Sequence, residues 1–227
     1  MRVPQREKLR GSQKCLQILV NDYPSLINTQ LAFWIGLPSA EGIHWRSPLK
    51  QDEYAEYRDS DAIDHLGMSL PKRSLESFWP RQGPQWDALA KTDRGDVILV
   101  EAKAHIREMV TDPCKAKSTR SQDVIRESLD ATKRFLGANP DVDWMKSFYQ
   151  YTNRLAHLYL LRELNSLPAY LLLVYFINDQ DVGGPGSEQQ WQGAIQLRDS
   201  YLRIPPKHRL SEYILHAFVD VGNLGSA

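Results

Sequence analysis

Two acidic side chains and a lysine stand close together in the segment from Gly83 to His105, GPQWDALAKTDRGDVILVEAKAH. Asp87 lies in a short alternating run, Trp86 to Lys91, and Glu101 and Lys103 end a run of aliphatic residues. Carboxylates bind hard divalent cations such as magnesium, and a lysine beside them can contact a phosphate or a water molecule. These residue types therefore indicate metal-assisted hydrolysis of a phosphate ester.

A hairpin is the element that would bring these side chains together. The tripeptide Asp93-Arg94-Gly95 is typical of a three-residue hairpin loop in which the glycine takes the left-handed conformation. With that loop, Thr92 pairs with Asp96, and counting back along the two strands puts Asp87 directly opposite Glu101. Opposed residues have Cβ atoms about 5 Å apart, so the two carboxylates repel each other unless a cation lies between them.

The predicted metal ligands on this hairpin are Asp87, Glu101 and the backbone carbonyl of Ala102. Lys103 shares the strand face of Glu101, so we expect it to position the attacking water, help to deprotonate it and stabilise charge on the phosphate. An acid and a lysine two residues apart also form ordinary surface pairs on a solvated sheet. The aliphatic run Val97 to Val100 favours the functional interpretation, because it indicates a strand buried on both faces, where charges need partners.

The spacing Pro84-x-x-Asp87, then thirteen residues, then Glu101-Ala102-Lys103 resembles the signature of the PD-(D/E)XK nuclease superfamily. It departs from that pattern in one respect, because two residues separate Pro84 from Asp87. The resemblance implies an α/β fold with a mixed central sheet of about four strands flanked by helices, the restriction-endonuclease-like fold. It also implies a nuclease that hydrolyses phosphodiester bonds with Mg²⁺ or Mn²⁺, with nucleic acid as its partner and DNA in preference to RNA.

In the superfamily, the helix before the sheet often supplies a further acid to the metal. The segment Pro48 to Leu66 is predicted as that helix, and it contains Glu53 and Glu56 about one turn apart. Glu56 is flanked by residues expected to be partly buried, whereas Glu53 continues an acidic run. The resemblance therefore assigns Glu56 as a further metal ligand, with Glu53 as the alternative.

A second set of polar residues follows one stripe of the helix predicted over Trp144 to Asn165. Gln150, Arg154 and His157 lie at helical intervals among apolar neighbours. An isolated amphipathic helix would turn such a stripe to water. By the resemblance, however, this helix faces the catalytic strands. Gln150 is then a catalytic candidate that orients the attacking water, Arg154 a candidate for binding a substrate phosphate, and His157 a weaker candidate for the site.

The polar segment Ile106 to Arg120 follows the catalytic strand. Lys115 and Lys117 lie in it and are candidates for binding the substrate, although a solvated loop is the alternative interpretation. His105 precedes this segment, and we expect it to be a hydrogen-bonded histidine at the strand end rather than a site residue.

The remaining pattern predicts a single domain over residues 1–227. Residues 1–47 are expected to form a helical N-terminal extension, residues 48–177 the nuclease-like core, and residues 178–227 a C-terminal elaboration of one helix and one strand. Apolar periodicity and breaks at proline and glycine predict the other elements: helices over 12–23, 26–37, 122–137 and 188–203, and strands over 75–79, 171–177 and 213–221.

The charge of the chain is balanced, with 28 basic and 28 acidic residues. Nucleic-acid-binding domains are usually basic, so this balance favours an alternative, a catalytically inactive member of the same fold that binds nucleic acid or protein. The basic residues are unevenly spread, however, since residues 1–14 carry five against one acid and residues 103–134 carry eight against five. An unrelated α/β domain is a third alternative, and it predicts that Asp87 and Glu101 are not neighbours.

The chain has no pattern typical of a signal peptide or a membrane span. The longest apolar stretch, Leu167 to Ile177, has eleven residues, far fewer than a spanning helix needs. The two cysteines, Cys15 and Cys114, have neither metal-ligand nor redox spacing. We therefore expect a cytoplasmic protein with no membrane association. The sequence is compatible with a homodimer.

Overall fold

The computed structural model describes residues 1–8 and 10–225, and a mixed five-stranded sheet forms its centre. The strands lie in the order β2 (Ile43–Ser47), β5 (Ala88–Thr92), β6 (Val97–Lys103), β7 (Ala169–Ile177) and β8 (Ile214–Asp220). The pairs β2–β5 and β5–β6 are antiparallel, whereas β6–β7 and β7–β8 are parallel. The expected α/β architecture with a mixed sheet is confirmed, but the sheet has five strands rather than four.

Two local predictions before the hairpin are wrong. In residues 1–47, the helices expected over 12–23 and 26–37 are confirmed, but the segment also contributes the edge strand β2, whose residue Ile43 pairs with Thr92. The strand expected over 75–79 is the short helix α4 (Leu75–Phe78), because the Ser74 hydroxyl accepts the N–H of Ser77 and caps its first turn. In both places the structure is determined by a contact that the pattern of apolar residues does not reveal: a strand pairing in the first and a helix cap in the second.

The hairpin of β5 and β6 has the register predicted from its loop. Gly95 is left-handed, with φ of 91°, and the Thr92 N–H donates to the Asp96 carbonyl at 2.9 Å. The ladder continues to the pair Ala88–Val100. There the Asp87 N–H also donates to the Val100 carbonyl, at 3.2 Å, so two residues face one, as in a β-bulge. The alternating run predicted from Trp86 is therefore interrupted at Asp87, and the direct pair predicted between Asp87 and Glu101 is not part of the ladder, which ends at Ala88.

A second, smaller sheet lies beside the hairpin. It is antiparallel and consists of β1 (Arg2–Val3), β3 (Glu56–Arg58) and β4 (Gln85–Trp86), with β3 in the middle. The helix predicted over 48–66 is therefore wrong in its first part, where only a short 3₁₀ turn (Lys50–Asp52) precedes β3, and the α-helix α3 spans Asp59–His65. The reason is non-local, since Val3 pairs with Glu56 and Trp86 pairs with Tyr57 across long sequence separations.

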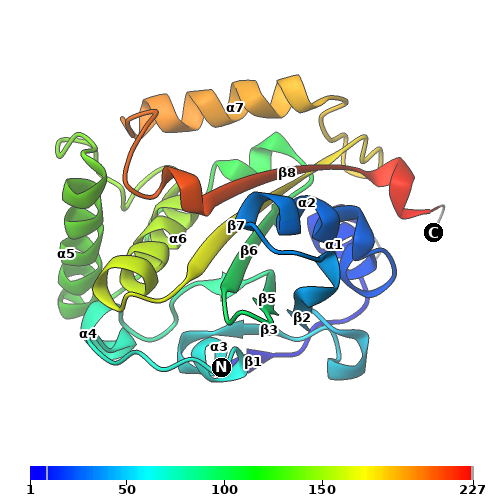
Figure 1. Cartoon of the computed structure of the whole chain (residues 1–227). Helices are drawn as coiled ribbons and strands as arrows, with labels where there is room; N and C mark the ends of the chain where they lie inside the picture. The colour runs from blue at the N-terminus through cyan, green and yellow to red at the C-terminus, as the bar shows by residue number, and fades with distance from the viewer. Residues whose placement is uncertain (9, 226–227) are drawn as a thin grey trace.

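Helices cover both faces of the five-stranded sheet (Figure 1). The helices α1 (Gly11–Asn21) and α2 (Ser25–Ile35) pack on one face, and α5 (Thr119–Leu136), α6 (Tyr149–Tyr159) and α7 (Glu188–Tyr201) pack on the other. The α6 helix begins later than the predicted Trp144, because Phe148 is left-handed with φ of 59°. Among the described residues, no helix is both long and apolar enough to cross a bilayer.

The two faces of β6 carry different residues. Ile98, Val100 and Ala102 belong to the apolar core under α1 and α2. Val97 and Leu99 belong to the core under α5 and α6. On this second face the aliphatic row ends and the next two positions are Glu101 and Lys103, so the strand brings two charged side chains beneath α6.

Candidate active site

Asp87 and Glu101 meet where β5 begins and β6 nears its end. Glu101 is only 4% exposed, whereas Asp87 is half-buried. The Ala102 N–H donates to the Asp87 carboxylate at 2.8 Å. Because the N–H and C=O of one strand residue point to the same side, the Ala102 carbonyl also lies on the side of Asp87, beyond the start of β5. The Asp87 carboxylate is thus held beside the backbone of Ala102, the residue that follows Glu101.

Two cations bind the Glu101 carboxylate directly. Lys103 Nζ contacts its Oε1, and Arg154 contacts its Oε2 through Nε at 2.8 Å and Nη2 at 2.7 Å. Lys103 Nζ also donates to the side-chain oxygen of Gln150 at 3.0 Å. The structure therefore unites residues from the hairpin with the polar stripe of α6, as the sequence predicted.

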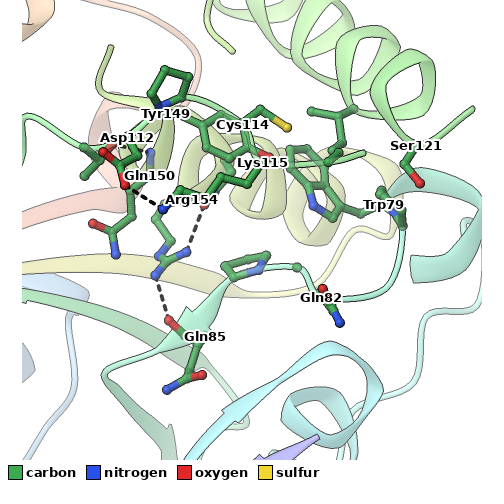
Figure 2. Close-up of a pocket in the computed structure, with 18 of the residues that line it drawn as sticks. Trp79, Gln82, Gln85, Asp112, Cys114, Lys115, Ser121, Tyr149, Gln150 and Arg154 are labelled. Atoms are coloured by element: carbon green, nitrogen blue, oxygen red, sulfur yellow. Dashed lines mark hydrogen bonds and ion pairs between the residues drawn. The ribbon is translucent and has the colours of Figure 1, made fainter. Parts of the chain in front are cut away.

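Arg154 also joins the site to the rest of the fold. Its Nη2 donates to the Gln85 carbonyl at 2.7 Å, its Nη1 donates to Asn153 Oδ1 at 2.9 Å, and its guanidinium lies over the Trp86 ring. Figure 2 shows the side chain reaching from α6 toward Gln85. Arg154 is 2% exposed, and these contacts occupy most of its donors. In this arrangement it holds Glu101 in place rather than presenting a free cation to a substrate.

Glu56 lies on a strand and not on the helix that the sequence predicted. Its carboxylate is buried and accepts hydrogen bonds from the amides of Gln13 at 2.8 Å, Gln5 at 3.3 Å and Gln85. Among residues 1–8 and 10–225, no three His, Cys, Asp or Glu side chains converge closely enough to hold one ion. Glu56 is therefore not placed as a third ligand of one ion with Asp87 and Glu101. Its negative charge contributes to the raised pKa of Asp87. The alternative, Glu53, is exposed and pairs with Arg2.

The two acids of the site have opposite pKa shifts. Burial raises the pKa of Asp87 to about 8, and the negative charge of Glu101 adds to this effect. Burial alone would raise the pKa of Glu101 too, but the charges of Arg154 and Lys103 outweigh burial and hold that pKa below its usual value. Asp87 is therefore the acid whose charge is least compensated, and a divalent cation beside it would complete its ionisation.

Lys103 remains charged in this setting. Burial alone would lower the pKa of Lys103, but the carboxylates of Glu101 and Asp87 outweigh burial and raise it. A lysine with a raised pKa is a poor proton acceptor at neutral pH, and it is well suited to stabilise negative charge.

A cleft opens on the α6 side of this site. Its volume is about 920 Å³, and Gln85, Gln150 and Arg154 form part of its wall. The predicted substrate-binding residues Lys115 and Lys117 also line it, and both are exposed. Figure 2 shows Lys115, Gln150 and Arg154 around the same hollow. The segment 110–118 is therefore the wall of a cleft, and it is irregular as expected.

The polar stripe of α6 is buried. Asn153, Arg154 and His157 are 7%, 2% and 7% exposed, so the stripe does not face water. His157 donates through Nδ1 to the Asn153 carbonyl at 2.8 Å and packs edge-on to Trp79. Burial lowers the pKa of His157 to about 4. It is a neutral core histidine at physiological pH.

His105 also has a structural role. Its Nδ1 accepts the N–H of Arg107 at 2.9 Å, and this contact caps the short 3₁₀ helix Ile106–Met109. The expectation of a hydrogen-bonded histidine at the strand end is confirmed.

Several residues of this region were not predicted from the sequence. Gln85 links Glu56 to Arg154, and Tyr175 lies next to Lys103 in the β6–β7 register. Arg198 on α7 is 3% exposed, stacks over the Tyr151 ring and donates to the Tyr175 hydroxyl at 3.2 Å. Tyr175 could have been identified from the sequence, because it follows an aliphatic run, as Glu101 and Lys103 do, and parallel pairing of the two runs brings their ends together. No local signal marks Arg198.

In comparisons with protein-family models, with curated proteins and with solved structures, no match to this chain was found. The geometry of the site and its cleft is therefore the basis for a functional conclusion.

Proposed function

We propose that this protein is a metal-dependent nuclease with a PD-(D/E)XK-type, restriction-endonuclease-like core. The order of elements supports this assignment: the antiparallel strands β2, β5 and β6 are followed by helices and then by β7, which lies parallel to β6. The acid-acid-lysine set lies at the hairpin of β5 and β6, the position that the signature requires. The fold assignment rests on this topology together with the spacing of Asp87, Glu101 and Lys103.

One observation carries the functional proposal: the hairpin register and the bulge bring Asp87 against Glu101 and Ala102. Two carboxylates with one carbonyl form the hard oxygen donor set that Mg²⁺ and Mn²⁺ prefer. Both cations of the site bond to Glu101, which leaves Asp87 with a raised pKa. The residues present therefore fit a divalent cation held by Asp87, Glu101 and the Ala102 carbonyl.

Each protein group would contribute a distinct part of the chemistry. A bound divalent cation would lower the pKa of a coordinated water and neutralise charge on the phosphate. Lys103 would stabilise the negative charge that develops on the phosphate, and Gln150 would hold the Lys103 ammonium in position. Arg154 would keep Glu101 ionised and oriented. No covalent intermediate is required.

The balanced charge supports a second candidate, a non-catalytic module of the same fold that binds nucleic acid or protein. The chain has 28 basic and 28 acidic residues, whereas nuclease surfaces usually carry a basic excess. In this candidate, Lys103 and Arg154 serve only to neutralise Glu101 inside the protein.

A cleavage assay separates the two candidates. The purified protein is incubated with labelled single-stranded and duplex DNA and RNA in Mg²⁺, Mn²⁺ or EDTA. We expect cleavage that EDTA abolishes and that Asp87→Asn or Lys103→Met lowers by at least about 100-fold. Cleavage that persists unchanged in both variants would contradict the proposal.

A matched control is available on the same hairpin. Asp93 has a side chain that is 74% exposed and pairs with His44. Asp93→Asn makes the same chemical change as Asp87→Asn away from the site, so it should retain the wild-type rate. Far-UV circular dichroism of each variant verifies that a lost rate does not reflect unfolding.

A further inference from the structure

The cleft beside the candidate active site shares two residues with the hydrogen-bond network that holds the buried charges. Glu101 is 4% exposed and the Lys103 side chain 13% exposed. Gln150 and Arg154, which bond to these two residues, form the inner wall of the cleft. The inner wall of the cleft is therefore one hydrogen bond away from both Glu101 and Lys103.

The size of the cleft suits one nucleic-acid strand better than a duplex. It measures about 920 Å³, near the upper end of the range of about 300–1,000 Å³ for pockets that enclose one small ligand. Specific duplex binding covers a far more extended surface, about 1,000–2,500 Å² of protein. A flexible single strand can bend its backbone into such a cleft, whereas the paired strands of a duplex cannot.

The charges around the cleft favour a phosphate backbone. Arg81, Lys115 and Lys117 line it with exposed side chains. Lys115 is paired with Asp112 at 2.6 Å, so Arg81 and Lys117 carry the less compensated charges. Cations along a groove bind successive phosphates of a strand without reading its sequence.

Two helix N-termini add to this positive field. Ser121 in the first turn of α5 and Tyr149 at the start of α6 both line the cleft. The first turns of both helices are fully described, and neither contains an acidic residue. The positive ends of the two helix dipoles therefore act on the same volume as the three side-chain cations.

From the recessed acids, the size of the cleft and its cationic lining, we infer that the substrate is single-stranded nucleic acid, which enters the cleft with its phosphates toward Arg81, Lys115 and Lys117. The inference rests on the proposed function for cleavage, but strand binding can be measured without it. Duplex would be bound weakly and cut only where it frays or carries a single-stranded extension.

Fluorescence anisotropy tests strand binding separately from catalysis. The probe is a fluorescein-labelled 20-nucleotide DNA, alone or annealed to its complement, titrated with the Asp87→Asn protein without divalent cation. We expect the single strand to bind at least tenfold more tightly than the duplex. The triple variant Arg81→Ala/Lys115→Ala/Lys117→Ala should lower single-strand affinity at least tenfold and reduce the salt slope by about 0.7 for each lost phosphate contact.

A triple variant of exposed lysines outside the cleft, Lys50→Ala/Lys72→Ala/Lys207→Ala, removes the same net charge and should keep the affinity within about twofold. A parallel Mn²⁺ cleavage assay uses the wild-type protein on the same two probes.

The outcomes distinguish the two proposals. Equal affinity for both probes, or loss of binding in both triple variants alike, overturns the strand-binding inference. Efficient cleavage of blunt duplex overturns it too, while the nuclease proposal stands. Selective single-strand binding that depends on the cleft cations, with no cleavage of either probe, supports the inference and rejects the nuclease proposal.

Discussion

The two faces of strand β6 differ in chemistry although they belong to the same seven residues. The face toward α1 and α2 presents Ile98, Val100 and Ala102 to an apolar core, and all three are nearly fully buried. The opposite face begins with aliphatic residues but ends with Glu101 and Lys103. The first face adds stability through packing alone, whereas the second buries charges that must be paired and that carry the proposed chemistry.

The largest effect on stability is expected from removing Arg154, one of the two cations that pair with Glu101. We expect Arg154→Met to lower the free energy of unfolding by about 3–5 kcal/mol, because it leaves a buried carboxylate without one of its partners. Urea denaturation measures this loss. The double variant Arg154→Met/Glu101→Gln should recover part of it, since the charge that needed a partner is gone. A loss of under about 1 kcal/mol in the single variant would show that the pair does not matter.

The raised pKa of Asp87 predicts that stability depends on pH through the face of β6 that carries Glu101 and Lys103, and not through the apolar face. The folded-state pKa of Asp87, about 8, lies above the ordinary value of 3.8 for an aspartate. Between these values the folded protein retains a proton that the unfolded chain has released. The contribution of Asp87 to stability is therefore full at low pH and declines as the pH rises toward 8. In the metal-free protein, Asp87→Asn should remove this part of the decline, which thermal unfolding at several pH values can measure.

The carboxyl group of Asp87 should also make metal binding depend on pH. Because a divalent cation requires the ionised carboxylate, Mn²⁺ affinity should rise about tenfold for each pH unit up to about pH 8 and then level off. Calorimetric titration in two buffers of different ionisation enthalpy should also detect proton release on binding below that pH. Affinity that does not change between pH 6 and pH 8 would rule out Asp87 as the titrating ligand.

A smaller change on the same face is expected from Gln150→Ala. This substitution removes the hydrogen bond to Lys103 Nζ at 3.0 Å, and bonds to charged groups contribute about 1.5–3 kcal/mol. The cleavage rate should fall at least about tenfold while Mn²⁺ affinity stays near the wild-type value, because Gln150 is not a metal ligand. Gln192→Ala, on the exposed side of α7 and outside the cleft, is a suitable control. A matching loss of metal affinity would show that Gln150 acts by holding the metal site together.

The smallest effect is expected on the apolar face. Ile98→Val removes one methylene from a side chain with no exposed surface and should cost about 1 kcal/mol of unfolding free energy. Mn²⁺ affinity and the cleavage rate should not change. A functional loss equal to that of Gln150→Ala would mean that the two faces of β6 are not independent.

The sequence predicted the hairpin correctly because its determinants are local. The loop Asp93-Arg94-Gly95 sets the register through one left-handed glycine, and the aliphatic run before Glu101 indicates a buried strand. The helix that carries Gln150 and Arg154 could be predicted from its spacing. That its polar stripe faces the catalytic strands was implied only by the resemblance, because the spacing alone would turn the stripe to water.

The sequence could not predict the elements that depend on distant pairing. Glu56 lies on strand β3 because two residues distant in the sequence pair with that strand. Val3 pairs with Glu56, and Trp86 pairs with Tyr57. The edge strand β2 exists only through its pairing with β5. Arg198 reaches the region of Lys103 from a helix near the C-terminus, and nothing in the local sequence signals such a contact.

The central claim is that Asp87 and Glu101 form a site for a divalent cation, and calorimetric titration with Mn²⁺ at pH 8 tests it most directly. We predict that the wild-type protein and Asp93→Asn bind one ion with the same affinity, and that Asp87→Asn, although folded, does not bind it. Wild-type binding that Asp87→Asn leaves unchanged, or no binding to the wild-type protein at all, would contradict the claim.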